Sequence, residues 1–112
     1  MSSLDFARAR AFIDAIPEGR WAAYTDVAGA GGNVRGAQAV GTWLRREGYG
    51  IRLDYRVLTV EDRMPDAFRS SGRDAPADPA SAVTRLKSEG VAIDARARAA
   101  QSQRFSATDW KP

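Results

Sequence analysis

The chain has 112 residues, of which 44% are hydrophobic and 9% aromatic, and 17 Lys and Arg against 14 Asp and Glu give a net charge of +3. This length suits one hydrophobic core and this composition suits a globular fold rather than a disordered chain. Because cysteine and histidine are absent from the sequence, it lacks thiolate nucleophiles, imidazole bases, disulfides and the usual ligands of structural zinc. We therefore expect neither a metal site nor a cofactor.

The sequence also lacks signals for a membrane or for export. No stretch of about 18 apolar residues is present for a transmembrane helix. The N-terminus has no apolar core flanked by a cleavage site. We expect a cytoplasmic protein with no membrane partner.

Apolar residues recur at helical spacing through residues 4–16 and predict the first helix there. They are Leu4, Phe6, Ala9, Phe12, Ile13 and Ile16. Pro17 and Gly19 end this helix. After a short extended stretch, Thr25 is the predicted N-cap of a short helix that continues through Ala28.

A glycine-rich turn follows the short helix. The turn residues are Gly29, Gly31, Gly32 and Asn33. The next helix is predicted over residues 35–46, with Gly48 just beyond its C-terminus. A short helix, a glycine turn and a second helix together are the pattern of a helix-turn-helix.

Two short strands are predicted next, Ile51–Asp54 and Arg56–Val60, and they would form a small β wing. The segment Glu61–Pro79 carries prolines and charges, so we expect a long loop. Asp78 and Pro79 are an N-cap and a first helical residue, and they predict a helix that Gly90 ends.

These elements predict a fold that is mainly α with a small β wing, a winged helix-turn-helix over residues 1–94. Residues 95–112 have only a weak helical pattern, so we expect a C-terminal surface tail. Docking of Phe105 or Trp110 on the core would order part of this tail.

Positive charge is concentrated in one part of the chain. Residues 35–56 hold five arginines (Arg35, Arg45, Arg46, Arg52, Arg56) against two acids (Glu47, Asp54), a difference that equals the whole net charge. Such a cluster is typical of a surface that binds phosphates. A solvated helix face followed by a strand would give the same pattern, and charge alone does not choose between the two.

Several short motifs occur in a characteristic order. They are Ile16-Pro17-Glu18-Gly19, Tyr24-Thr25-Asp26-Val27-Ala28, Gly32-Asn33 and Ala37-Gln38-Ala39-Val40-Gly41. This ordered set resembles the DNA-binding half of the alkylguanine-DNA alkyltransferase family over residues 16 to about 60. The run Leu86–Val91 is similar to the end of that family's closing helix.

The resemblance also indicates what the chain lacks. Where the transferring enzymes carry Pro-Cys-His-Arg-Val, this chain has Leu53-Asp54-Tyr55-Arg56-Val57. Asp54 stands at the position of the alkyl-accepting cysteine, and a carboxylate is a far poorer acceptor than a thiolate. The chain therefore resembles the non-enzymatic alkyltransferase-like subfamily. That resemblance implies binding to double-stranded DNA, recognition of alkylated guanine, and flagging of the lesion for other proteins such as those of nucleotide excision repair.

The resemblance and the arginine cluster together define a candidate DNA-binding set. Its members are Tyr24, Arg35, Gly36, Gln38, Ala39, Arg45, Arg46 and Arg52. Tyr24 matches a family tyrosine that contacts the target phosphate. Gln38 stands where the family has an arginine that fills the base stack, and Arg35, about one turn earlier, can take its place. A lesion pocket is implied at Asp54, Tyr55 and Arg56.

Structural roles fit several of the same residues. Tyr24 suits a core position with its hydroxyl at the edge. For Ala37 and Gly41, close helix packing is favoured over DNA contact, whereas Gly36 and Ala39 are assigned to DNA. Arg56 also suits a bracing role in the wing, and Asp54 and Tyr55 fit an ordinary strand. A protein-interaction or regulatory module on the same scaffold is the alternative function. No dimerisation element is evident, so a monomer is expected.

Overall fold

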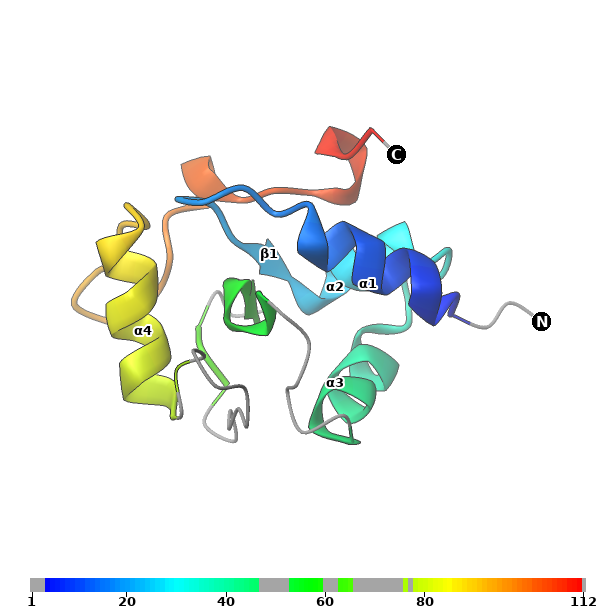
Figure 1. The fold of residues 1–112 in the computed structure, drawn as a ribbon, viewed down its shortest axis with the longest axis horizontal. Coiled ribbons are helices and arrows are strands. Elements are labelled where there is room, and N and C mark those ends of the chain that lie inside the picture. The colour runs from blue at the N-terminus through cyan, green and yellow to red at the C-terminus, as the bar shows by residue number, and fades with distance from the viewer. Residues whose placement is uncertain (1–3, 47–52, 60–62, 66–75, 77, 112) are drawn as a thin grey trace.

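The computed structural model describes residues 4–46, 53–59, 63–65, 76 and 78–111, and it shows helices arranged around a short two-stranded parallel sheet (Figure 1). A mainly helical fold with a small sheet is thereby confirmed. The elements in chain order are α1 (Phe6–Asp14), β1 (Ala22–Ala23), α2 (Tyr24–Ala30), α3 (Ala37–Arg46), the 3-10 helix η1 (Asp54–Arg56), β2 (Val57–Leu58), α4 (Pro79–Ser88), and the 3-10 helices η2 (Gln101–Gln103) and η3 (Ala107–Asp109).

The first helix is shorter at both ends than the sequence pattern predicts. α1 begins after Asp5, whose carboxylate accepts a hydrogen bond from the backbone N–H of Arg8 at 3.1 Å. A carboxylate in this position satisfies one of the free N–H groups of the first turn. α1 buries Ala9, Phe12 and Ile13 on one face and packs against α2 (Figure 1).

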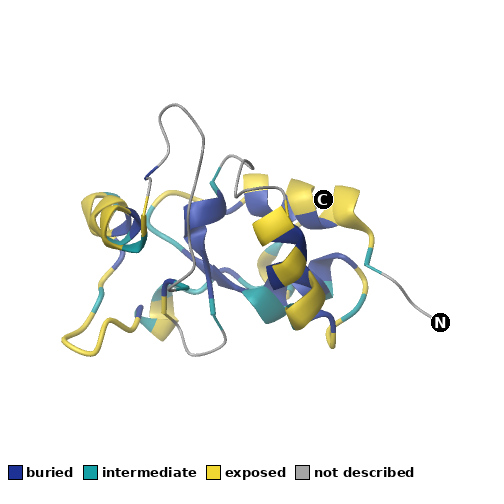
Figure 2. Cartoon of the chain, turned by 90° about the horizontal axis from the view of Figure 1, so that it is seen from below, coloured by how far each residue is buried: buried dark blue, intermediate teal, exposed yellow. Residues whose placement is uncertain are grey.

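The two strands pair in a way that the sequence does not predict. β1 and β2 are parallel, with Ala22 opposite Val57 and Ala23 opposite Leu58. All four residues are buried, so their sequence shows none of the polar and apolar alternation of a half-exposed strand. Figure 2 shows this sheet in dark blue between helices whose outer faces are exposed.

The predicted β wing is not confirmed within residues 53–59, where Val57–Leu58 alone forms a strand. Leu53 has a backbone φ of +69°, which interrupts an extended strand, and Asp54–Arg56 then form the single 3-10 turn η1. The short strand that follows, β2, pairs with β1 rather than with the preceding segment. Ile51, Arg52 and Val60, which the prediction included, lie outside the described residues.

The central helix pair lies close to its predicted position. α2 begins at Tyr24, one residue before the predicted start, and Asp26 rather than Thr25 supplies the capping contact by accepting the backbone N–H of Ala23 at 2.8 Å. α3 begins at Ala37, two residues later than predicted, and Arg46 is its last described residue. The α2 and α3 helices pack directly on each other (Figure 1).

The last α-helix begins and stops as predicted. The Asp78 carboxylate accepts the backbone N–H of Ser81 at 2.8 Å, and Pro79 is the first residue of α4. Beyond the helix, Gly90 has a φ of +103°, a conformation that glycine adopts without strain. No described helix has the length and apolar character that crossing a membrane requires.

The C-terminal segment docks on the core through Phe105 and Trp110. The Phe105 ring stacks on Phe12 with centroids 5.3 Å apart, and Trp110 meets the same Phe12 ring edge-on at 5.6 Å. Backbone hydrogen bonds join Trp21 to Gln103 and Phe105, at 3.2 and 2.7 Å. Hydrogen bonds between residues 92–94 and 98–100 also cross the expected boundary at residue 94, so the tail is continuous with the core.

Candidate nucleic-acid interface

The outer side of α3 and its preceding turn form an exposed surface, which we call the α3 outer face. Its residues are Arg35, Gln38, Ala39, Thr42, Arg45 and Arg46, all exposed. Their spacing of three or four residues places them on one side of a helix. The opposite side buries Val40, Gly41, Trp43 and Leu44 against the core. The helix that carries most of the predicted DNA-binding set therefore presents that set to solvent.

The α3 outer face carries positive charge at both ends. Arg35 precedes the helix, Arg45 and Arg46 close it, and the helix has no acidic residue in its first turn. Arg35 lies in the turn two residues before α3, and the ten residues of α3 are about 15 Å long at a rise of 1.5 Å per residue. None of the three arginines forms an ion pair with the described part of the chain. Their charges are therefore available to an external anion.

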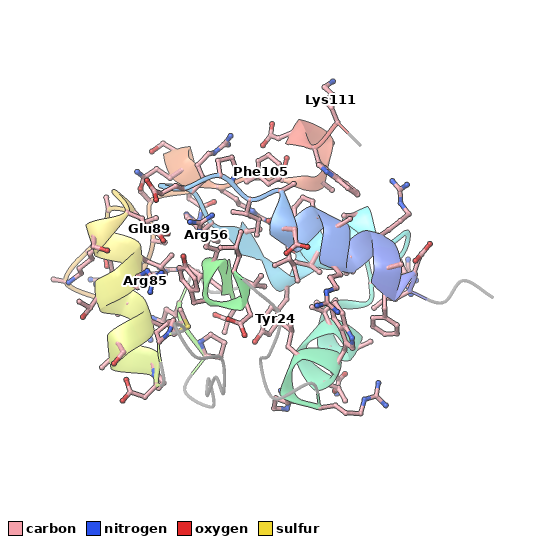
Figure 3. The ribbon with its side chains drawn as sticks, viewed as in Figure 1. Tyr24, Arg56, Arg85, Glu89, Phe105 and Lys111 are labelled. Atoms are coloured by element: carbon pink, nitrogen blue, oxygen red, sulfur yellow. The ribbon has the colours of Figure 1, made fainter. Side chains whose placement is uncertain are left out.

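Tyr24 lies at the inner edge of this face, where α2 meets α3 (Figure 3). Its side chain is half-buried, and one edge of the ring packs on Gly41. A Cβ at position 41 would lie 3.3 Å from Cε2 of Tyr24. The packing role of Gly41 is thus confirmed, and Tyr24 combines an anchored ring with partial exposure next to the arginines.

Gly36 does not belong to the exposed surface. It is buried, and a Cβ there would lie 3.1 Å from both the Cγ of Leu4 and the backbone oxygen of Asn33. Its small size is therefore explained by packing of the N-terminal segment on the turn, and its assignment to DNA is corrected. Ala39 is exposed as the DNA assignment requires. Arg52 lies outside the described residues.

The residues of the predicted lesion pocket contact the end of α4. Tyr55 and Arg56 are buried, and Figure 3 shows Arg56 close to Glu89. The Tyr55 hydroxyl donates a hydrogen bond to the Glu89 carboxylate, and Nε of Arg56 donates to Oε1 of the same group at 3.0 Å. Arg56 also donates through Nη1 to the backbone oxygen of Ile16 at 2.7 Å. These two residues brace η1 against the end of α4, and their assignment to a lesion site stays a prediction.

These contacts shift two pKa values. Burial and the hydrogen bond to Glu89 both raise the pKa of Tyr55, so its phenol stays protonated as a donor. Burial alone would lower the pKa of Arg56, but its hydrogen bond to Glu89 and the neighbouring charges outweigh that effect and raise it. Arg56 and Glu89 therefore form a buried ion pair, with each side chain 8% exposed.

Asp54 differs from its two neighbours because it has no charged partner among the described residues. Its side chain is 1% exposed, and Oδ2 makes no hydrogen bond with the described residues. Burial raises the pKa of this carboxyl to about 7, and a backbone hydrogen bond from Tyr55 offsets only part of that rise. Asp54 is therefore close to half protonated at neutral pH.

Some residues at the interface were not identified from the sequence. Thr42 lies on the α3 outer face, three residues beyond Ala39, and helical spacing was sufficient to find it. Val34 is 72% exposed in the turn beside Arg35, and because it lies outside the helix, helical spacing does not identify it. Glu89 partners Arg56 across 33 residues, a separation that no local pattern reveals. The described residues contain no cluster of three or more acids suited to a metal ion.

Neither the comparison with protein-family models nor the search of curated proteins finds a match for this chain. The function is therefore inferred from the chemistry of the α3 outer face.

Proposed function

We propose that this protein binds double-stranded DNA through the α3 outer face, as a non-enzymatic domain of the winged helix-turn-helix class that acts in DNA damage recognition in the cytoplasm. The observation that carries the proposal is the exposure of Arg35, Arg45 and Arg46 on one side of α3 with no ion-pair partner among the described residues. Arginines in this arrangement bind phosphate oxygens and fix the orientation of a protein on the duplex.

The spacing of these arginines suits a groove. The ten residues of α3 are about 15 Å long at the helical rise, and this length is comparable to the roughly 12 Å width of the major groove. Between the arginines, Gln38, Ala39 and Thr42 are uncharged and no larger than glutamine, so the helix can approach the base edges. The positive ends would then contact the phosphates on the two sides of the groove.

Neutralising the C-terminal pair of arginines tests this surface. We expect R45Q/R46Q to weaken binding to a duplex on the order of 10- to 100-fold near 0.1 M salt and to lower the slope of log K against log salt by about 2, because each lost phosphate contact releases one counterion fewer. Fluorescence anisotropy with a labelled duplex across a salt series measures both quantities.

The matched control removes the same amount of charge elsewhere. Lys87 on α4 and Arg96 in the turn after it are both exposed, and in Figure 1 α4 and α3 lie on opposite sides of η1. We expect K87Q/R96Q to retain most of the affinity and the salt slope of the wild type. If the control lost as much as R45Q/R46Q, net charge rather than the α3 outer face would drive binding. Failure of the wild type to bind at low salt would eliminate the proposal.

Recognition of alkylated guanine is the narrower part of the proposal. It is supported by Tyr24 at the edge of the α3 outer face and by the resemblance to alkyltransferase-like proteins, and it includes flagging of the lesion for nucleotide excision repair proteins. Because Tyr55 and Arg56 face α4, the lesion would have to be recognised from Tyr24 and α3. We expect tighter binding to a duplex with one alkylated guanine than to its unmodified counterpart. Equal affinities would remove this part and leave general DNA binding intact.

One observation favours a second function, docking of another protein on the same face. Val34 is apolar and 72% exposed beside Arg35, and exposed apolar side chains at a charged edge suit a protein partner. The salt series separates the two functions, because an interaction module has no DNA affinity for R45Q/R46Q to lose.

A further inference from the structure

Arg45 and Tyr24 meet at the same point of α3. A Cβ at Gly41 would lie 3.5 Å from Nη1 of Arg45 and 3.3 Å from Cε2 of Tyr24. Nη2 of Arg45 also donates a hydrogen bond to the Thr42 hydroxyl at 3.3 Å. The Arg45 side chain therefore lies back along α3 over the preceding turn, with its guanidinium beside the Tyr24 ring.

The adjacent arginine has no such support. Arg46 is exposed, and no hydrogen bond, ion pair or ring contact joins its side chain to the described residues. An exposed arginine normally samples many rotamers, and a ligand that fixes it must oppose the lost entropy. Arg45 thus has a side-chain contact that Arg46 lacks among the described residues, although both belong to the last turn of α3.

We propose that Gly41 and Thr42 are positioning residues that hold the Arg45 guanidinium in place for a phosphate before DNA binds, an inference that rests on the proposed function. Gly41 leaves the space in which Tyr24 and Arg45 lie side by side against the helix backbone. Thr42 holds one end of the guanidinium and leaves its other N–H groups available to a phosphate. Arg45 is thereby the preorganised contact of the α3 outer face, and Arg46 is a mobile one.

Two substitutions disturb the support without removing the charge. T42V keeps the shape of the side chain and removes the oxygen that Arg45 contacts. We expect it to weaken DNA binding by about twofold to tenfold, the usual effect of releasing one ordered side chain, with no change in the salt slope because the number of phosphate contacts is unchanged. T42S retains the hydroxyl and should bind as the wild type does.

G41A separates an effect on DNA binding from an effect on stability, because only the DNA affinity is expected to fall. A methyl group at position 41 forces the Tyr24 ring to shift by a few tenths of an ångström and occupies the space up to Nη1 of Arg45, at 3.5 Å. Because Tyr24 and Arg45 lie side by side there, we expect a similar loss of affinity. Alanine is also the better helix former, so the midpoint of denaturant unfolding should be unchanged or higher. A residue with a purely structural role would change both quantities in the same direction.

A double-substitution cycle assigns the effect to Arg45. In an R45Q background, T42V and G41A should cause no additional loss of affinity, because the side chain that they position is gone. NMR relaxation of the arginine Nε–H groups in the free protein should show greater order for Arg45 than for Arg46. The inference is overturned if the two arginines are equally mobile, or if T42V and G41A bind like the wild type. A wild type that does not bind DNA would instead overturn the proposed function on which it rests.

Discussion

Replacing Glu89 with alanine is expected to lower the free energy of unfolding by about 3–5 kcal/mol, the usual effect of removing one partner from a buried ion pair. The Glu89 carboxylate accepts hydrogen bonds from Nε of Arg56 and from the Tyr55 hydroxyl. Arg56 is 8% exposed, so the E89A variant leaves a guanidinium charge inside the protein with only the Ile16 carbonyl oxygen as acceptor among the described residues. Urea unfolding at pH 7, followed by circular dichroism, measures the loss.

A second ion pair of the Glu89 carboxylate, with Arg85, provides the control. Arg85 lies 3.7 Å from Oε2 of Glu89, but its side chain is 45% exposed and its charge is largely hydrated. We expect R85A to cost less than about 1 kcal/mol, as exposed ion pairs usually do. Equal losses in E89A and R85A would show that the buried pair does not attach α4 to η1. A loss confined to E89A would confirm that attachment.

Local patterns predicted the helices because the signals that begin and end a helix lie within it. Asp78 and Pro79 at one end and Gly90 at the other fix α4 through contacts over three or four residues. The exposed side of α3 could be predicted for the same reason, since a helical period of 3.6 residues places Arg35, Gln38 and Arg45 on one face. These features need no information from distant parts of the chain.

The pairing of distant segments could not be predicted in this way. β1 and β2 have only two residues each, too few for a period to appear, and their partners lie 35 positions apart at Ala22 and Val57. The predicted wing is not confirmed, because the pattern of apolar residues does not reveal the positive φ of Leu53 or the 3-10 turn that follows it. Within this turn, Tyr55 and Arg56 contact Glu89.

The α3 outer face and the predicted lesion pocket show this division within one candidate site. Which residues lie on the α3 outer face follows from their spacing along one helix, so Arg45, Arg46 and Ala39 lie where the sequence predicts. Which residues line a pocket depends on the element that packs against η1, and the end of α4 contacts Tyr55 and Arg56. Asp54 remains as the buried polar residue of η1 that this packing leaves without a charged partner.

Substituting asparagine for Asp54 is expected to stabilise the protein by on the order of 4 kcal/mol at pH 8 and by only about 1–2 kcal/mol at pH 5. The carboxyl has a pKa of about 7 in the folded protein, against an ordinary value of 3.8, because burial disfavours its charged form. The folded state therefore binds this proton more tightly than the unfolded state. Stability falls as the pH rises from about 4 to about 7, by up to roughly 1.4 kcal/mol per pH unit.

The D54N variant removes this dependence because its amide stays neutral throughout. Denaturant unfolding of both proteins at pH 5, 6, 7 and 8 measures the difference. This range avoids the acid region, where Asp94 and Asp109 take up protons and where backbone hydrogen bonds hold the pKa of each below its usual value. D14N, a substitution of an exposed aspartate on α1, should keep the wild-type profile. If D54N and the wild type lost stability in parallel between pH 5 and pH 8, Asp54 would have to be ionised in the folded protein at both values, and a partner for Oδ2 would have to exist.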